Sequence, residues 1–417
     1  MLSRRQLLKG VGGGSLAVGT AALTGNLALP GLSWAAETGV PLAGGVPSGV
    51  RDEAVLEALP GKVPLIKLSY RPPNYETPIS HFNSTFTRND AFFVRYHLAV
   101  IPEVDAASWR LSVGGDSVER SLTLTLDQLR NDFPAVEIAA VCQCSGNRRG
   151  LSQPHVAGVQ WGYGAMGNAK WKGARLKDIL ERAGIKKEAV EIVLDGEDGP
   201  VLDKTPDFVK SIPAWKALDE NALVAYEMNG EPLPHFNGFP ARVVIPGWTA
   251  TYWVKHITSI NAIAKPFDGF WVKSAYRIPT QMFPVVQRFV SQETTANTPI
   301  TEMVINSLIT NVNEGQRVPV GKPLDVRGVA WDGGYGIQTV EVSLNGGRSW
   351  QAATLGEDAG RFSFRTWRYR VTPQRAGSMT IMAKATNRIG QSQASELIFN
   401  PAGYHNNVVQ RVTVQAA

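Results

Sequence analysis

The chain has 417 residues, more than a single domain usually holds, so two domains are expected. Its formal net charge is +6, of which Arg4, Arg5 and Lys9 supply half, and the remainder of about +3 is too small to indicate a nucleic-acid-binding protein. The only cysteines are Cys142 and Cys144, and a pair separated by one residue makes a poor disulfide framework.

The N-terminal segment has the composition of an export signal. Arg4 and Arg5 precede an uncharged stretch from Gly10 to Pro30 that is rich in Gly, Ala and Leu, and the small residues Ala35–Ala36 suit cleavage. We therefore predict a twin-arginine signal peptide over residues 1–36 and a periplasmic location. A membrane anchor is the alternative, but the stretch is weakly hydrophobic, and no later apolar run reaches about 18 residues. Because this export route carries folded proteins, the signal favours a protein that holds a complex cofactor.

The next part of the chain mixes strands with short helices. Residues 37–89 are punctuated by Pro and Gly and predict an extended N-terminal arm. An amphipathic pattern over Lys172–Gly184 predicts a helix that ends at its glycine. Apolar runs predict strands at Phe92–Val94, Ala135–Ala140 and Val190–Leu194. The absence of a regular βαβ repeat indicates an α+β domain, mixed α/β in content, over residues 90–300.

The pattern changes after residue 300. Asn345-Gly346-Gly347 is typical of a hairpin turn. Alternation with period two predicts strands at Leu324–Ala330, Val340–Leu344, Arg361–Arg365 and Thr380–Ala385. We therefore predict an immunoglobulin-like β-sandwich over residues 301–417.

The segment Val141–Gly150 joins both cysteines to two arginines. Soft thiolates suit zinc, copper(I) or iron, but two cysteines at this spacing complete neither a four-ligand zinc site nor an iron–sulfur cluster. No C-x-x-C-H motif for covalent haem is present. What remains is a metal that takes one protein thiolate and draws its other ligands from an organic cofactor. Two buried, unreactive cysteines are the alternative, disfavoured because Arg148 and Arg149 would rarely be buried without partners.

These residues resemble the sulfite oxidase family of molybdopterin enzymes, whose cysteine motif C-[AS]-G-N-R-R is matched by Cys144–Arg149. The resemblance continues in order along residues 90–400 and is strongest to the molybdenum subunits of bacterial, cytochrome-linked sulfite dehydrogenases. Further similar segments are Phe92–His97, Trp171–Leu176, Ala225–Pro234, Gly238–Gly247 and Val340–Trp350.

The resemblance implies a molybdenum-molybdopterin cofactor (Moco) with Cys144 as the metal ligand, while Cys142 has no counterpart and is expected to be a packed residue. It implies catalytic roles for Arg95, His97, Arg149, Tyr276 and Trp161. It also implies cofactor contacts from Phe93, Val94, Arg95, Tyr96, His97, Asp198, Asn237, Arg242, Trp253, Val254 and Lys255. Arginines suit an oxyanion substrate because they form charge-assisted hydrogen bonds. The alternative for Arg95 and Arg149 is that they are surface or salt-bridged arginines. The alternative for Tyr276 is a tyrosine packed at the domain junction, and for Trp161 it is a core tryptophan.

The implied activity is oxidation of sulfite to sulfate, with electrons passing singly to a c-type cytochrome that can be a tightly bound subunit. No haem is expected on this chain, and nucleic acid is not an expected partner. A second hypothesis is a sibling molybdoenzyme acting on protein-bound sulfur, or a sulfoxide reductase, which is disfavoured because such relatives generally lack the β-sandwich. A third is an exported binding module without metal.

Overall fold

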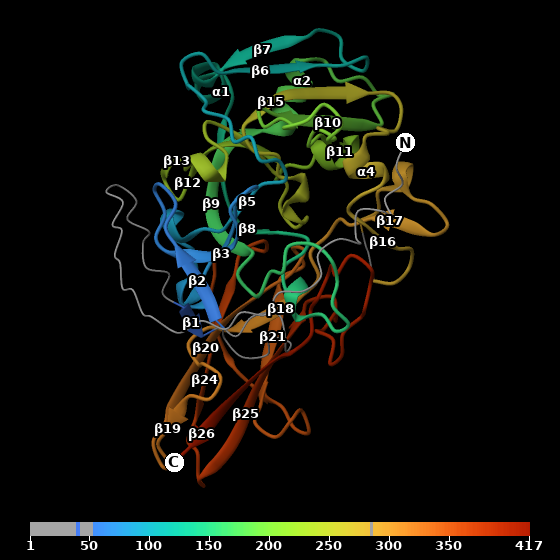
Figure 1. Cartoon of the computed structure of the whole chain (residues 1–417). Coiled ribbons are helices and arrows are strands. Elements are labelled where there is room, and N and C mark those ends of the chain that lie inside the picture. The colour runs from blue at the N-terminus through green and yellow to red at the C-terminus, as the bar shows by residue number, and fades with distance from the viewer. Residues whose placement is uncertain (1–38, 42–52, 284–286) are drawn as a thin grey trace, which may run out of the picture. The chain divides into compact units, whose positions relative to one another are not determined.

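The computed structural model describes residues 39–41, 53–283 and 287–417 (Figure 1). The predicted signal peptide at residues 1–36 lies outside this part of the chain. None of the helices in the described ranges is both long enough and apolar enough to span a bilayer.

The first described residues form a sheet, not the irregular arm predicted from the sequence. Leu65 and Tyr75 pack against Val94 and Tyr96 in a small core of their own. The strands follow in sheet order as β1 (Gly39–Pro41), β2 (Glu53–Glu57), β3 (Leu65–Ser69), β4 (Asn74–Glu76) and β5 (Val94–Arg95). The strands β1 to β4, of three to five residues between prolines, are too short to give a period-two signal, so the sequence pattern missed them. The strand predicted at Phe92–Val94 overlaps β5 only at Val94.

Two larger sheets form the domain that follows. In one, β15 pairs in parallel with β6 and antiparallel with β10. Its order is β11 (Lys210–Pro213), β10 (Glu191–Gly196), β15 (Ile257–Ile263), β6 (Arg110–Gly114) and β7 (Leu122–Thr125). The other runs β13 (Glu231–Pro232), β12 (Leu223–Met228), β9 (Met166–Arg175) and β8 (Ala135–Gln143), with β14 (Arg242–Val244) also on β12. Strands β8 and β9 pair over the whole length of β8, which fixes where Cys144 leaves the sheet.

Few helices cover these sheets. Thr125 begins α1 (Leu126–Asn131) with a capping box, in which its hydroxyl accepts from the N–H of Gln128. The helix predicted over residues 172–184 is shorter, because α2 spans Leu176–Arg182 and residues 172–175 belong to β9. The backbone of those residues pairs with both β8 and β12, and this pairing overrides their helical pattern. The other α-helices of the described ranges are α3 (Ala214–Ala217) and α4 (Phe270–Lys273).

A two-stranded ribbon, β16 (Arg277–Pro279) and β17 (Asn297–Pro299), precedes a sandwich of two sheets. The first sheet runs β18 (Asn306–Ile309), β20 (Leu324–Trp331), β24 (Arg365–Val371) and β23 (Thr354–Asp358). The second runs β19 (Arg317–Val318), β26 (Gln410–Ala416), β25 (Gly377–Asn387), β21 (Ile337–Ser343) and β22 (Gln351–Ala352). The strand predicted at residues 361–365 starts only at its last residue. The predicted fold class, α+β with a C-terminal β-sandwich, is confirmed.

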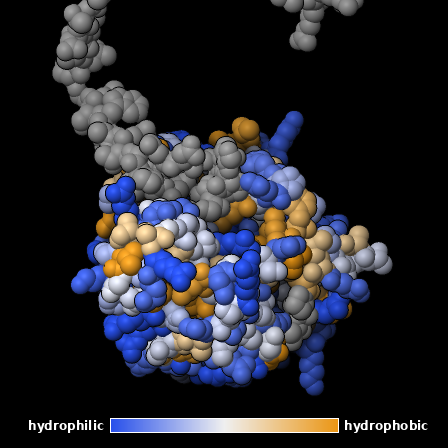
Figure 2. All heavy atoms as spheres, turned by 90° about the horizontal axis from the view of Figure 1, so that it is seen from below, coloured by the Kyte–Doolittle hydropathy of each residue, from blue (hydrophilic) through white to orange (hydrophobic). Residues whose placement is uncertain are grey.

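The sandwich contacts the cysteine strand directly. The N–H of Val141 donates to the carbonyl oxygen of Phe362 at 2.9 Å, and the indole of Trp331 donates to the side-chain oxygen of Gln143 at 2.5 Å. On the face shown in Figure 2, hydrophobic residues form small groups separated by hydrophilic ones. The hydrogen bonds from Val141 to Phe362 and from Trp331 to Gln143 position the end of β8 against the C-terminal β-sandwich.

Candidate active site

Cys144 sits in a tight turn directly after β8. Its N–H donates to the carbonyl oxygen of Ala165 at 2.9 Å, and its own carbonyl accepts from the N–H of Asn147 at 2.9 Å. Arg148 takes a left-handed conformation with φ of 69°, which reverses the chain toward Arg149. The Cys144 thiol lies where two cavities meet, since it lines both.

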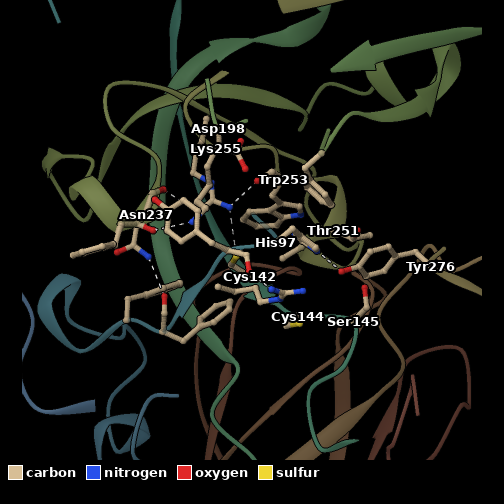
Figure 3. A pocket seen from close by; sticks show the side chains of 18 residues that line it. His97, Cys142, Cys144, Ser145, Asp198, Asn237, Thr251, Trp253, Lys255 and Tyr276 are labelled. Atoms are coloured by element: carbon tan, nitrogen blue, oxygen red, sulfur yellow. Dashed lines mark hydrogen bonds between the residues drawn. The ribbon is translucent and has the colours of Figure 1, made fainter. Parts of the chain in front are cut away.

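The first cavity has a volume of about 630 Å³ and is mostly aromatic and cationic. Among the described residues that line it, the charged ones are Arg95, Arg242 and Lys255 against a single carboxylate, Asp198. Asp198 and Lys255 lie at one end of the cavity, and Cys144 lies toward the other (Figure 3). Such an excess of positive charge out of water favours an anionic ligand.

Arg242 is buried without a carboxylate partner among the described residues. Its Nη1 donates to the carbonyl of Asn237 at 3.0 Å and its Nη2 to the carbonyl of Trp253 at 2.9 Å, while its Nε has no partner. Burial lowers the pKa of Arg242, and burial together with Arg242 lowers that of Lys255 strongly. Burial raises the pKa of Asp198 to about 6, against the opposing effect of Lys255. The positive charge at this end of the cavity is therefore not fully balanced by the carboxylate of Asp198.

Cys142 also lines the first cavity, which the sequence did not predict. Residues two apart on a strand face the same side, so Cys142 and Cys144 point the same way from the end of β8 (Figure 3). The Nη2 of Arg242 donates to the Cys142 sulfur at 3.9 Å. Burial raises the pKa of the Cys142 thiol to about 11, so at neutral pH this thiol keeps its proton.

The second cavity, of about 690 Å³, contains Arg149. The Nε of Arg149 donates to the carbonyl of Ala402 at 2.8 Å and its Nη1 to that of Val159 at 3.3 Å. Glycines surround this side chain: an added Cβ at Gly146 would lie 2.6 Å from its guanidinium, and one at Gly403 would lie 2.8 Å from its Cγ. The arginine is therefore fixed in position by main-chain acceptors and close packing.

Arg95 and Tyr276 line both cavities, as Cys144 does. The Nη1 of Arg95 donates to the side-chain oxygen of Asn74 at 3.1 Å. The hydroxyl of Tyr276 is hydrogen-bonded to Nε2 of His97 (Figure 3). Burial, followed by the positive charge of Arg95, lowers the pKa of His97 well below its usual value, which keeps the imidazole neutral. These residues place a cation and an oriented phenol beside the Cys144 thiol.

Residues 97–271 match the oxidoreductase molybdopterin binding domain, and residues 297–417 match the Mo-co oxidoreductase dimerisation domain. Sulfite oxidase of Arabidopsis thaliana is 33% identical over 328 residues, covering 75% of this chain and 81% of that protein. The chain belongs to the sulfite oxidase family. Mitochondrial sulfite oxidase of Homo sapiens is 34% identical over 374 residues, covering 85% of this chain and 66% of that protein. This chain thus spans about two thirds of the length of that relative.

The sulfane dehydrogenase SoxCD from Paracoccus pantotrophus has a similar structure. The match has a TM-score of 0.71 and 27% sequence identity, and it covers 83% of this chain and 85% of that one. The predictions of the sulfite oxidase family and of a molybdenum-molybdopterin cofactor are confirmed by these matches.

The residues present fit this cofactor of the sulfite oxidase family. Among the described residues, no three His, Cys, Asp or Glu side chains gather as a protein-only metal site would require. Cys144 offers one thiolate, so the remaining ligands would come from the cofactor. Polar atoms that lack partners, the Oγ1 of Thr251 and the Nε of Arg242, belong to residues lining the first cavity. Thr251, Arg242 and Lys255 would hold the phosphate-bearing part of the cofactor.

Most residues implied by the family resemblance gather at the two cavities. Arg149 and Trp161 line only the second cavity, while Arg95 and Tyr276 line both. The first cavity is lined by the predicted residues Phe93, Arg95, Tyr96, His97, Asp198, Asn237, Arg242, Trp253 and Lys255. The side chains of Val94 and Val254 are buried in hydrophobic clusters and line neither cavity. Val94, in β5, stands between the lining residues Phe93 and Arg95 and so points the opposite way.

Asn237 is a structural part of the cavity wall. Its side-chain nitrogen donates to the carbonyl of Phe93 at 3.1 Å, and its side-chain oxygen accepts from Nζ of Lys62 at 2.5 Å. Lys62 is almost fully buried, and burial lowers its pKa to about 7. No local sequence pattern connects this lysine, which precedes β3, with the site.

Several aromatic residues of the site were also missed. Phe208 stacks on His97 with ring centres 3.6 Å apart, and Trp271 and Tyr404 line the second cavity. Only Ser145, which follows the cysteine directly and bonds Thr249 at 3.0 Å, had a local signal. Phe208 and Tyr404 come from loops and Trp271 from α4, all far away in sequence, where an isolated aromatic residue is not distinguishable from a core residue.

Proposed function

We propose that the protein oxidises sulfite to sulfate. The observation that carries this proposal is the second cavity, where Arg95 and Arg149 approach the Cys144 thiol and no carboxylate is among the described lining residues. A small oxyanion matches two guanidinium groups better than a neutral or cationic substrate does. Relatives named sulfite oxidase, at 33% to 36% identity, support the same reaction.

The reaction adds one oxygen atom from water to sulfite and releases two protons and two electrons. The bound cofactor would supply a metal centre that transfers the oxygen and accepts the electrons. Arg95 and Arg149 would hold the oxyanion by charge-assisted hydrogen bonds. Tyr276, oriented by the neutral imidazole of His97, would offer its hydroxyl to a substrate oxygen. The aromatic walls formed by Trp161 and Trp271 would limit access of water to the reacting atoms.

We further propose that the protein is exported to the periplasm and delivers its electrons one at a time to a c-type cytochrome. The twin arginines Arg4 and Arg5 and the uncharged stretch behind them support export. Replacing both arginines with lysine should retain the protein in the cytoplasm, as measured by cell fractionation. Periplasmic recovery of that variant would contradict this route.

The decisive assay of the reaction is steady-state turnover of the cofactor-loaded protein with sulfite and cytochrome c. Reduction of cytochrome c should depend on sulfite and yield sulfate in a ratio of two electrons per sulfate. No reduction above background would remove sulfite oxidation from consideration.

Oxidation of protein-bound sulfane sulfur is the second candidate, favoured by the structural similarity to the sulfane dehydrogenase. Both candidate substrates would place an oxidisable sulfur at the metal, so the two candidates are distinguished by comparing their rates of turnover. A carrier protein bearing a persulfide should be turned over faster than free sulfite only if this second candidate is correct.

A further inference from the structure

The second cavity is completed by the C-terminal domain. Ala402 and Tyr404, in the segment that precedes β26, line it together with Arg149 and Tyr276. The carbonyl of Ala402 accepts a hydrogen bond from Nε of Arg149 at 2.8 Å. The substrate side of the active site thus depends on residues more than 250 positions away from the cysteine turn.

The backbone of Tyr404 is firmly held. The side-chain nitrogen of Asn400 donates to the carbonyl of Tyr404 at 2.8 Å, and the N–H of Tyr404 donates to the side-chain oxygen of Asn400 at 3.0 Å. A reciprocal pair of this kind fixes the loop without any contribution from the cavity.

The ring of Tyr404 is also fixed. It stacks on Tyr276 with centroids 5.7 Å apart and an interplanar angle of 8°, and the Arg149 guanidinium lies 5.2 Å from its centroid. Offset stacking and a cation over the ring face are both favourable contacts of an aromatic residue. The phenol therefore has one orientation relative to the two residues that approach Cys144.

The hydroxyl of Tyr404 remains available to a ligand. It forms no hydrogen bond with the described residues, although the residue is only 8% exposed. Burial raises its pKa, so the hydroxyl keeps its proton and remains a donor. The indole N–H of Trp161, which lines the same cavity, is likewise buried without a partner. These two donors beside two cations would match an acceptor-rich ligand.

We propose that Tyr404 contacts the substrate, donating a hydrogen bond from its hydroxyl to an oxygen atom of an oxyanion held between Arg95 and Arg149. The C-terminal domain thereby takes part in selecting the substrate. This inference deepens the proposed oxidation of sulfite and rests on it for the identity of the oxyanion. The hydroxyl of Tyr276 is hydrogen-bonded to His97, whereas the hydroxyl of Tyr404 has no hydrogen bond among the described residues.

The test uses the cofactor-loaded protein with Tyr404→Phe, which keeps the stacked ring and removes only the hydroxyl. Sulfate, the product anion, is the probe, and its dissociation constant is measured by calorimetry together with kcat and KM for sulfite. We expect the dissociation constant for sulfate to rise about tenfold, because a hydrogen bond to a charged group is lost. The KM for sulfite should rise similarly, while the molybdenum content stays constant.

Tyr335→Phe is the matched control. Tyr335 donates its hydroxyl to the carboxylate of Glu302 at 2.9 Å and lies outside both cavities, so its variant should bind sulfate as the wild type does. Thermal unfolding of both variants separates a local effect from a loss of fold. If Tyr404→Phe unfolds at a lower temperature than the wild type, Tyr404→Trp is the second variant, because it keeps a stacking ring and displaces the hydrogen-bond donor. Wild-type affinity for sulfate in Tyr404→Trp would overturn the proposal.

The outcomes distinguish the role of Tyr404 from the proposed reaction. Sulfite turnover with an unchanged sulfate dissociation constant in Tyr404→Phe overturns the role of Tyr404 and leaves the proposed reaction intact. Sulfate binding that depends on Tyr404, without turnover of sulfite, supports the anion contact and overturns the reaction. No sulfate binding by the wild-type protein overturns the role of Tyr404.

Discussion

The two cavities that meet at Cys144 differ in what builds them. The described residues lining the first cavity all lie between Phe92 and Tyr276, within the N-terminal domain. The second takes part of its wall from Ala402 and Tyr404. Cofactor binding is thus a property of one domain, whereas the substrate side needs both. Changes in the C-terminal domain should therefore alter substrate affinity without removing the cofactor.

The largest expected effect comes from Cys144, which lines both cavities together with Arg95 and Tyr276. Cys144→Ser should reduce turnover of sulfite by about a thousandfold or more, because a hydroxyl is a poor substitute for a soft thiolate ligand. The measurement is kcat of protein expressed with the cofactor pathway intact, with molybdenum determined in the same sample.

Cys142→Ser is the matched control, since it changes the other thiol on the same side of β8. A serine hydroxyl can still accept from Arg242, which now contacts the Cys142 sulfur at 3.9 Å. Activity should therefore stay within about threefold of the wild type, well below the tenfold loss that about 1.4 kcal/mol of barrier would cause. Equal losses in the two variants would show that the metal ligand is assigned wrongly.

Variants of the adjacent residues Arg148 and Arg149 should distinguish a role in attaching the C-terminal domain from a role in binding the substrate. Arg149→Met should lower kcat/KM for sulfite about a hundredfold, because a cation facing the substrate is lost. Arg148 lies outside both cavities and donates to the side chain of Asn306 and the carbonyl of Val408 in the C-terminal domain. Arg148→Met should instead lower the free energy of unfolding by about 2–4 kcal/mol, because buried acceptors lose their donor.

Steady-state kinetics and urea unfolding of both variants test this separation. If Arg148→Met raises KM as strongly as Arg149→Met does, the two arginines share one role.

The sequence was most informative where chemistry is local. The turn from Cys144 to Arg149 carries the proposed metal ligand and one proposed substrate arginine within six residues, so its motif was readable without the fold. The same holds for Arg95 and His97, two residues apart. The period-two patterns also sufficed to place the β-sandwich after residue 300.

What could not be predicted depends on packing between distant segments. The bond between His97 and Tyr276 joins residues 179 positions apart, and Tyr404 reaches the site only because the C-terminal domain packs there. The buried position of Lys62 follows from the N-terminal sheet, which was expected to be an irregular arm. Tertiary contacts of this kind leave no local pattern in one sequence.

The buried lysine behind the first cavity gives a pH-dependent prediction. The pKa of Lys62 is lowered by burial to about 7 in the folded protein, against an ordinary value of 10.5. Between these values the unfolded chain binds more protons at this group, so the free energy of unfolding should rise as pH increases. Lys62→Met should remove about 2 kcal/mol of the rise between pH 7.5 and 9.5.

The measurement is urea unfolding of both proteins at the two pH values. An identical increase in wild type and variant would mean that Lys62 stays charged in the folded protein. Lys62→Met also removes the hydrogen bonds from Lys62 to the carbonyl of Asn89 at 2.6 Å and to the side chain of Asn237 at 2.5 Å, but it removes them at both pH values. The difference between the two proteins in how the free energy of unfolding changes with pH therefore reports the titration of Lys62.

The smallest expected effect tests whether Arg149 is fixed by close packing. Gly403 has φ of 61°, and a Cβ added there would lie 2.8 Å from Cγ of Arg149. Cγ of Arg149 cannot move away without weakening the hydrogen bond from Nε of the same side chain to the carbonyl of Ala402. Gly403→Ala should therefore shift the guanidinium and lower kcat/KM for sulfite about tenfold. Gly315→Ala is the control, since Gly315 has φ of 71° and open space around its added Cβ, and it carries the same backbone strain. If both variants lose activity equally, backbone strain in the C-terminal domain, and not the position of Arg149, controls the second cavity.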